Sequence, residues 1–346
     1  MCDVSIIIPV FNGEKWINNC MKSIASQTIL DKEIKLEIVV YDDGSTDESK
    51  QILEKWAQYF TEKGVYFIIT GAKTTRGVGA AKNGAISMSS GSFLCFQDID
   101  DVMQPERIMQ QWQYAVNHHD TLVGSRISRM PPNSTPRYVS WANNMTPSQL
   151  MLQIYTSNGS TLLMPTWFCH RSVYDKVGGF DENGAGTPED LIFFHNHVAL
   201  GGKLYRIDKK LVEYTYHENA ASLSVTKECI WNIQLNRLQK NILQYWGNFT
   251  IWNAGKSGRK LVRALNSENL KKVIAFCDVD KKKIGRIIEL YCTNKRKVIK
   301  RVPVIHFLEA KSPLIICVKL DLTNGQFESN LASMNLCEGK DYILFC

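Results

Sequence analysis

The chain has 346 residues, of which 44% are hydrophobic, and this composition argues against a disordered protein because such a chain can bury one large core or two smaller ones. Its ten cysteines include no Cys-x-x-Cys pair, which argues against a disulfide framework or a zinc site, and its formal net charge of +7 is compatible with a polyanionic partner. No apolar run approaches the about 18 residues of a membrane span and no cleavable leader precedes the first strand, so we expect a cytoplasmic protein with no membrane partner.

The first residues predict a β-α-β unit. Residues 4–10 form a continuous apolar run that is typical of a buried parallel strand, and a loop at 11–13 leads into an amphipathic helix. The second predicted strand, residues 36–41, runs directly into Asp42 and Asp43. Carboxylates therefore stand where this strand ends.

A third strand is predicted at residues 65–69, and a helix rich in small residues follows it. Gly77 and Gly79 allow the backbone at the start of that helix to approach a ligand, while Arg76 and Lys82 supply positive charge. This segment is therefore a candidate binding surface.

The fourth predicted strand, residues 93–97, ends in Asp98, Asp100 and Asp101. Three carboxylates in four residues repel each other strongly unless a cation neutralises them. At the end of an extended strand Asp98 and Asp100 would point the same way and could share Mg²⁺ or Mn²⁺. The alternative is an acidic turn before a helix whose first turn holds Pro105.

Strands that alternate with helices predict an α/β sheet that binds its ligand at the carboxyl ends of the strands. Four motifs carry a more specific signal, and they follow each other in this order: Ile-Pro-Val-Phe-Asn at 8–12, Tyr-Asp-Asp-Gly-Ser-Thr-Asp at 41–47, Gly-Val-Gly-Ala-Ala-Lys-Asn at 77–83 and Phe-Gln-Asp-Ile-Asp-Asp at 96–101. In order and spacing they resemble the family 2 glycosyltransferases of the GT-A fold. The resemblance continues to about residue 226 and implies a nucleotide-sugar transferase.

The resemblance also implies roles for individual residues. Five residues would bind the nucleotide-sugar: Pro9, Phe11, Asp43, Arg76 and Asp98. Within this set, Asp43 would accept the uracil N3 hydrogen, and Pro9 and Phe11 would flank the base. Arg76 would be a further nucleotide contact.

Three residues are candidate ligands of Mn²⁺ or Mg²⁺: Asp98, Asp100 and His217. For His217 a diphosphate contact and a structural histidine are alternatives. The family pattern matches Glu189 and Asp190 to its catalytic acidic pair, and it implies that Asp190 is the base that deprotonates the acceptor. An ordinary acidic helix start is the alternative for this pair.

The middle of the chain, residues 126–168, does not follow a generic pattern. In glycosyltransferases of this fold the segment after the metal motif shapes the acceptor pocket, so the resemblance implies that its aromatic and arginine side chains contact sugars or bases. Core packing is the alternative, and we favour it for Trp167 and Phe168.

We expect three parts: a GT-A domain at 1–226, a helical linker at 227–246 and a small Rossmann-like α/β domain at 247–346. The glycine-bearing turn of the last part is followed by Asp278, as in dinucleotide binders, but Asn253 replaces the first glycine of the fingerprint. A structural or RNA-facing module is therefore the favoured alternative to dinucleotide binding.

The expected reaction is sugar transfer with inversion, dependent on a divalent metal. The two-domain arrangement resembles animal members of the family that move galactose from UDP-galactose to the queuosine base of a tRNA anticodon, which implies UDP-galactose and tRNA as partners. The Lys and Arg density between residues 256 and 301 is compatible with RNA. The alternatives are transfer of another sugar, such as N-acetylglucosamine, to a cytosolic protein or glycan, and a non-catalytic binding module.

Overall fold

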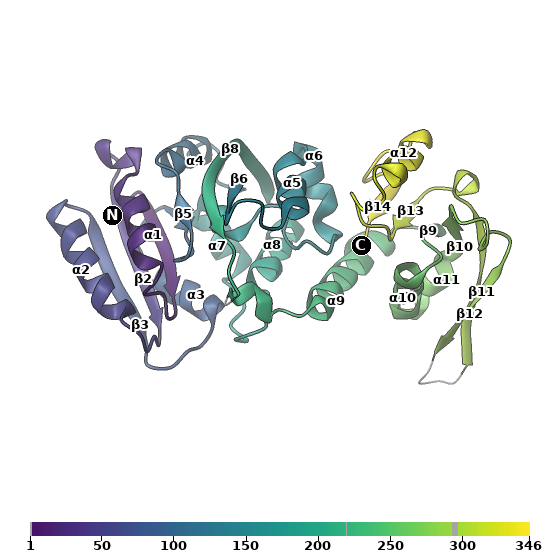
Figure 1. Cartoon of the computed structure of the whole chain (residues 1–346), viewed down its shortest axis with the longest axis horizontal. Helices are drawn as coiled ribbons and strands as arrows, with labels where there is room; N and C mark the ends of the chain where they lie inside the picture. The colour runs from purple at the N-terminus through teal and green to yellow at the C-terminus, as the bar shows by residue number, and fades with distance from the viewer. Residues whose placement is uncertain (1, 219, 293–296) are drawn as a thin grey trace. The chain divides into compact units, whose positions relative to one another are not determined.

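The computed structural model of the chain describes residues 2–218, 220–292 and 297–346 (Figure 1). The chain divides into two compact units: the first contains Met1–Met151 and Ser160–Ile230, and the second contains Leu152–Gly159 and Trp231–Cys346. This division differs from boundaries at 226 and 246, because a short segment from the middle of the sequence joins the second unit.

Backbone and side-chain hydrogen bonds explain where that segment lies. The main-chain N–H of Ser157 donates to the carbonyl of Cys346 at 2.5 Å, and the side chain of Gln234 donates to the carbonyl of Thr156. These bonds link the backbone of the segment to residues of the second unit.

The first unit is built on an eight-stranded sheet with the strand order β3-β2-β1-β4-β7-β6-β8-β5. The bounds are β1 Val4–Val10, β2 Leu36–Asp43, β3 Tyr66–Ala72, β4 Phe93–Phe96, β5 Val102–Met103, β6 Thr121–Met130, β7 Phe168–His170 and β8 Lys203–Thr215. Strands β3, β2, β1 and β4 are mutually parallel, and β7 is antiparallel to both β4 and β6. The parallel strands therefore end at one edge of the sheet, and β7 separates them from β6 and β8.

Helices cover this sheet, and their apolar residues build its core. Their bounds are α1 Ile17–Ala25, α2 Ser49–Glu62, α3 Val78–Met88, α4 Arg107–Ala115, α5 Pro136–Asn144, α6 Pro147–Leu152, α7 Arg171–Val177 and α8 Glu189–Ala199. Ile6, Ile38 and Leu53 are among the fully buried core residues. Trp167 and Phe168 are also fully buried, so the prediction that they pack in the core is confirmed.

The second unit contains a six-stranded sheet with the order β11-β12-β10-β9-β13-β14. The strands are β9 Phe249–Trp252, β10 Val273–Asp278, β11 Ile287–Cys292, β12 Lys297–His306, β13 Leu314–Ile316 and β14 Tyr342–Leu344, with helices α10 Lys256–Ala264, α11 Ser267–Lys272 and α12 Gln326–Ser333. Helix α9, Lys227–Leu238, precedes them in the sequence. All the strand pairs are parallel except β11 with β12, so the predicted α/β class is confirmed.

The glycine-bearing turn of the second unit is closed by its own acid. One oxygen of Asp278 accepts hydrogen bonds from the Ala254 main chain and the Lys283 ammonium, each at 3.0 Å, and the other accepts from the Asp280 main chain at 3.0 Å. Asn253 stands at the start of this turn with φ of 106°. Because the chain itself satisfies the acid that a dinucleotide ribose would need, the structure favours a structural role for this turn.

No helix in the described part of the chain combines the length and the apolar character needed to cross a bilayer.

Candidate functional site

A turn directly after β4 carries three carboxylates. The main-chain N–H of Asp101 donates to the carbonyl of Asp98 at 3.2 Å, and the Gln97 side chain donates to the carbonyls of both aspartates at 2.8 Å. Buried Arg107 holds this glutamine, donating from Nη1 to its Oε1 at 2.6 Å. The premise that an extended strand aligns the aspartates is therefore wrong, because a hydrogen-bonded turn brings them together.

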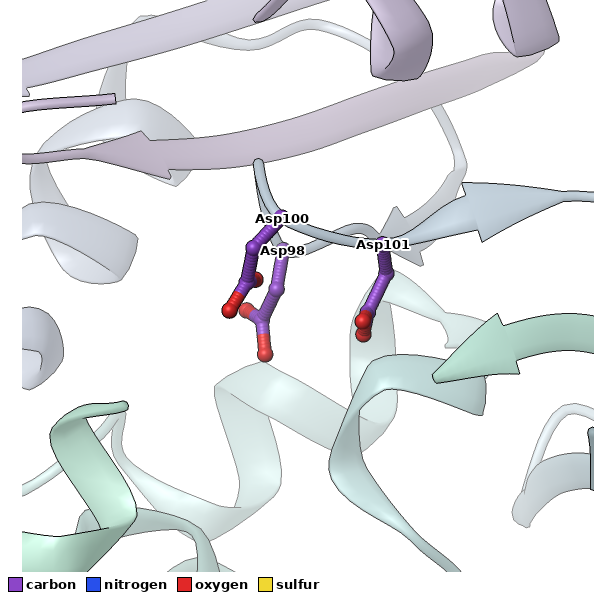
Figure 2. Close-up of side chains that lie close together, drawn as sticks. All are labelled: Asp98, Asp100 and Asp101. Carbon is purple, nitrogen blue, oxygen red and sulfur yellow. The ribbon is translucent and has the colours of Figure 1, made fainter. Parts of the chain in front are cut away.

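Asp98, Asp100 and Asp101 form one compact group (Figure 2). Each offers a carboxylate oxygen, and these ligand atoms all lie within 4.8 Å of one another. Figure 2 shows the carboxylates of Asp98 and Asp100 side by side, with Asp101 beyond them on the same turn. The predicted pair lies together, and Asp101 is an additional candidate that the spacing argument missed.

Burial makes this group costly without a cation. Asp101 is fully buried; its Oδ1 accepts the main-chain N–H of Thr215 at 2.8 Å, whereas its Oδ2 has no hydrogen-bond partner among the described residues. Burial, together with the nearby Asp100 and Asp98, raises the pKa of Asp101 well above its usual value. Burial also raises the pKa of Asp98 to about 7, although Lys82 opposes the rise. An orphaned oxygen among three oxygen donors fits a hard divalent cation such as Mg²⁺ or Mn²⁺.

His217 reaches this group through a carboxylate. Its Nε2 lies 2.8 Å from Oδ2 of Asp100, and its ring stacks on Trp16 with the centroids 5.1 Å apart. The sequence predicted His217 as a site residue. It did not indicate Trp16, because the two residues are about two hundred positions apart and only the fold brings their rings together. The histidine is thereby held beside a candidate metal ligand.

Helix α3 delivers a buried lysine to the site. Lys82 Nζ lies 2.7 Å from Oε1 of Glu189, and the exposed fractions of the two side chains are 1% and 9%. Gly79 permits this approach, because a Cβ there would lie only 2.0 Å from the carbonyl oxygen of Asp181, just before α8. The carboxylates of Glu189, Asp98 and Asp190 outweigh burial and raise the pKa of Lys82. This buried lysine thus interacts electrostatically with both acidic groups.

Asp190 occupies the first turn of α8, as its sequence context predicts. Its Oδ1 accepts the main-chain N–H of Leu191 at 2.7 Å. Burial raises its pKa to about 6 and Glu189 adds to the rise, whereas Lys82 opposes it. A carboxylate that titrates close to neutral pH is chemically suited to accept a proton from a hydroxyl group during a reaction.

Asp43 is buried at the end of β2 and holds the loop before α3. Its carboxylate accepts hydrogen bonds from the Thr75 hydroxyl at 2.7 Å and from the main-chain N–H groups of Arg76 and Gly77 at 2.8 to 3.0 Å. The Arg76 guanidinium points elsewhere and pairs with Glu182 at 2.8 Å. Most of the acceptor capacity of Asp43 is therefore used by the loop, and Oδ1 keeps one lone pair for a ligand.

Pro9 and Phe11 lie at the end of β1, beside the end of β2. Phe11 is 52% exposed although it is a large apolar residue. The next residue, Asn12, joins the two strand ends: its side-chain oxygen accepts the Thr46 main-chain N–H at 2.8 Å, and its own N–H donates to the Ser45 hydroxyl at 2.8 Å. The parallel strand ends thus form one continuous edge with an accessible aromatic ring.

A second cluster, which we call the arginine–tyrosine cluster, consists of Arg129, Tyr138, Tyr214 and Tyr216. Arg129 lies near the end of β6, and its guanidinium carbon is 4.0 Å from the ring centre of Tyr214 and 5.4 Å from that of Tyr216. Asp190 contributes to the raised pKa of Tyr138, for which burial is the main cause. Sequence reasoning placed Arg129 in the segment that shapes the acceptor pocket but could not see this cluster, since it joins β6, α5 and β8.

Comparison with known proteins identifies the family. Residues 5–178, half of the chain, match the family described as Glycosyl transferase family 2. The chain is 30% identical to the putative glycosyltransferase EpsH of Bacillus subtilis (strain 168) over 247 residues, which are 70% of this chain and 65% of EpsH. It is 27% identical to the poly(ribitol-phosphate) beta-N-acetylglucosaminyltransferase TarS of Staphylococcus aureus (strain MW2) over 178 residues, 50% of this chain and 30% of TarS.

The chain spans less than two thirds of the length of the curated relatives that it matches. Two solved structures share its fold. The crystal structure of S. aureus TarS 1–349 in complex with UDP-GlcNAc matches with a TM-score of 0.54 and 19% identity, covering 78% of each chain. The mannosyltransferase PcManGT from Pyrobaculum calidifontis, in complex with GDP-Man and Mn²⁺, matches with a TM-score of 0.52 and 18% identity, covering 69% of this chain and 64% of the other. The chain therefore belongs to glycosyl transferase family 2, and its first unit has the GT-A fold.

Proposed function

We propose that the chain is an inverting, metal-dependent glycosyltransferase that moves galactose from UDP-galactose to the queuosine base of a tRNA anticodon. The observation that carries the catalytic part is the buried Lys82, which faces both the carboxylate turn after β4 and the Glu189–Asp190 pair. Asp98 and Asp190, whose pKa values are both raised mainly by burial, interact with this one cation, an arrangement that suits a site that binds a charged donor and removes a proton from an acceptor.

The donor would lie along the edge formed by the ends of β1, β2 and β4. Phe11 and Pro9 would pack against the uracil, and the free lone pair on Asp43 would accept its N3 hydrogen. Charge that grows on the departing diphosphate would be offset by Mn²⁺ or Mg²⁺ held between the carboxylates of Asp98, Asp100 and Asp101. His217 would orient Asp100 through their hydrogen bond, and direct ligation of the ion is the alternative role for this histidine.

Asp190 would act as the base. The acceptor hydroxyl oxygen forms a bond to the anomeric carbon from the face opposite the diphosphate, the bond from that carbon to the diphosphate oxygen breaks, and the hydroxyl proton passes to Asp190. UDP leaves with the electron pair of the broken bond. An α-linked donor sugar then gives a β-linked product.

Several observations support a UDP-sugar donor and an acceptor that contains phosphodiester groups. TarS has been crystallised with UDP-GlcNAc, and the name of TarS gives poly(ribitol-phosphate), a phosphodiester polymer, as its acceptor. RNA is also a phosphodiester polymer. Galactose and queuosine rest on the resemblance of the two-domain arrangement to the tRNA-modifying members of the family, and this acceptor implies that the reaction takes place in the cytoplasm.

N-acetylglucosaminyl transfer from UDP-GlcNAc is the second candidate, because the TarS complex contains that donor. A non-catalytic binding module is a weaker alternative: a protein that performs no reaction has no use for three mutually repelling carboxylates with an orphaned buried oxygen.

The test incubates the full chain with total tRNA, Mn²⁺ and either UDP-galactose or UDP-GlcNAc, and digests the tRNA for mass spectrometry of its nucleosides. We expect a queuosine nucleoside heavier by one hexose with UDP-galactose, and none with the Asp190→Asn variant. A hexosamine adduct in its place would select the second candidate. Hydrolysis of UDP-galactose without any modified nucleoside would retain the enzyme and reject the tRNA acceptor.

A further inference from the structure

Among the described residues of the first unit, one arginine of β6 has no carboxylate partner. Arg129 donates from Nε to the Thr135 hydroxyl at 3.3 Å, whereas its Nη1 is buried and has no hydrogen-bond partner among the described residues. Arg126, on the same strand, also has a buried Nε without a hydrogen-bond partner among the described residues, but this atom forms an ion pair with Asp208 at 3.3 Å. Leaving a charged donor buried and unpaired is unfavourable by more than a neutral hydrogen bond contributes, so Arg129 has a reason to gain a ligand.

The surroundings of Arg129 hold its guanidinium in place. Strand pairing sets Arg129 directly beside Tyr214, whose ring supports the guanidinium from a distance of 4.0 Å, and Tyr216 adds a second ring at 5.4 Å. Stacking on aromatic faces fixes the plane of an arginine and leaves its outer N–H groups directed away from the rings. A guanidinium fixed in this way keeps donor capacity that a phosphate oxygen can fill.

Resting on the proposed transferase function, we propose that Arg129 is an acceptor-side subsite that binds a phosphate group of the acceptor next to the hydroxyl that receives the sugar. Phosphate oxygens could come from two sources, the diphosphate of the donor or a phosphodiester of the acceptor. The sheet order favours the acceptor. The donor edge is formed by β1, β2 and β4, while Arg129 and Tyr214 belong to β6 and β8, which β7 separates from that edge.

The neighbouring groups agree with this position. Burial is the main cause of the raised pKa of Tyr138; Arg129 opposes the rise and Asp190 adds to it, so this tyrosine interacts electrostatically with both Arg129 and the proposed base. The residue after Tyr214, Thr215, donates its main-chain N–H to Asp101 at 2.8 Å, so this strand end lies next to the carboxylate turn. A phosphate held by Arg129 would therefore sit beside the catalytic groups without entering the carboxylate turn, where like charges would repel it.

The first experiment uses inorganic phosphate as the probe, so that it does not depend on the identity of the acceptor. Phosphate is titrated into the full chain saturated with UDP and Mn²⁺, and binding is followed by calorimetry. We expect Arg129→Gln to weaken phosphate binding about tenfold, since it removes a charge-assisted hydrogen bond, and Arg129→Lys to weaken it less. The matched control, Arg126→Gln, should bind as the wild type does. Absence of phosphate binding in the wild type, or equal binding by Arg129→Gln, would overturn the proposal.

The second experiment separates the two sources of phosphate. UDP binding in Mn²⁺ is measured without added phosphate, and Arg129→Gln should leave it unchanged within about twofold; an equal loss of UDP affinity would assign Arg129 to the donor diphosphate and reject the acceptor subsite. Thermal unfolding identifies any variant that has not folded. If Arg129→Gln does not fold, Arg129→Lys is compared with the wild type in its place.

A third arm connects the subsite to RNA. An anticodon stem-loop that carries queuosine should show a KM about tenfold higher with Arg129→Gln, and a salt dependence of binding that is shallower by about 0.7 to 0.9 of a unit, the share of one phosphate contact. If the stem-loop receives no sugar from the wild type while the phosphate and UDP results hold, the RNA acceptor is wrong and the phosphate subsite stands. If the stem-loop is modified equally by wild type and Arg129→Gln, the subsite is wrong and the RNA acceptor stands.

Discussion

In each unit a buried parallel strand leads into a turn that contains an aspartate, and the pKa values of the two aspartates are shifted in opposite directions. In the first unit Asp101 keeps a buried oxygen without a hydrogen-bond partner among the described residues, and burial with its acidic neighbours raises its pKa. In the second unit Asp278 receives two hydrogen bonds from its own turn and one from Ala254 in the turn after β9, and these outweigh burial and lower its pKa. A strand-end aspartate is therefore informative about function only when its hydrogen-bonding capacity is left unfilled.

One lysine in each unit shows the same difference. Lys283 pairs with Asp278 and Asp280, both within its own turn, and this arrangement closes the loop. Lys82 comes from α3, pairs with Glu189 from α8 and also responds to Asp98 from the turn after β4. The first lysine stabilises local structure, whereas the second connects distant parts of a site.

Removing a carboxylate from the first turn tests this comparison most strongly. We expect Asp100→Asn to lower kcat at least about a thousandfold, because a ligand for the divalent ion is lost, and to leave the unfolding temperature of metal-free protein unchanged or higher, since mutual repulsion falls. Chelation of Mn²⁺ should produce the same loss of activity in the wild type. Near-normal turnover of a UDP-sugar in chelator would reject the metal assignment.

Asp190→Asn should lower kcat by about a hundredfold or more while UDP binding stays the same, because the variant loses the base and keeps the donor edge. Single-turnover kinetics and calorimetry with UDP measure the two quantities separately. A parallel fall in UDP affinity would move Asp190 to the donor site.

Lys82 should influence how kcat/KM depends on pH. The pKa of Asp190 is about 6, and a base must be deprotonated, so we expect kcat/KM to decrease as the pH falls below about 6. Glu189 raises the pKa of Asp190 and Lys82 lowers it. Lys82→Met should therefore move the acidic limb of the kcat/KM profile to higher pH, and Glu189→Gln should move it to lower pH. The double variant should return towards the wild-type profile. Identical profiles for all four proteins would show that the lysine does not tune the base.

The smallest expected effect concerns the second turn. Asp278→Asn replaces a carboxylate that accepts from two backbone groups and Lys283, so it should lower the free energy of unfolding by about 2 kcal/mol and leave UDP-sugar hydrolysis per folded molecule unchanged. Since the native pKa of Asp278 is lowered, its contribution to stability is present at neutral pH and is lost as the pH falls through that pKa. Urea denaturation of the wild type and the variant at pH 7 and pH 3 measures the difference in unfolding free energy and its pH dependence. A variant that keeps the wild-type stability but loses UDP-sugar hydrolysis would contradict a purely structural role.

Much of the fold could be predicted from the sequence because its signals are local. Apolar runs such as Val4–Val10 and Val273–Asp278 are strands in the structure, and the acids that follow them could be expected at strand ends. Asp98 and Asp100 could also be grouped correctly, although for a wrong geometric reason, because any compact path places residues two apart close together.

Only the tertiary structure decided which polar and charged groups have hydrogen-bond or ion-pair partners. Whether a charged group is satisfied depends on partners from distant parts of the chain: Lys82 meets Glu189 across more than one hundred residues, and the pairing of β6 with β8 sets Arg129 beside Tyr214, with no carboxylate partner among the described residues. The segment Leu152–Gly159 joins the second unit for the same reason, since its backbone bonds with Gln234 and Cys346, both far away in the sequence. Periodicity and spacing describe how a residue relates to its neighbours along the chain, whereas hydrogen-bond satisfaction and charge balance depend on how distant elements pack.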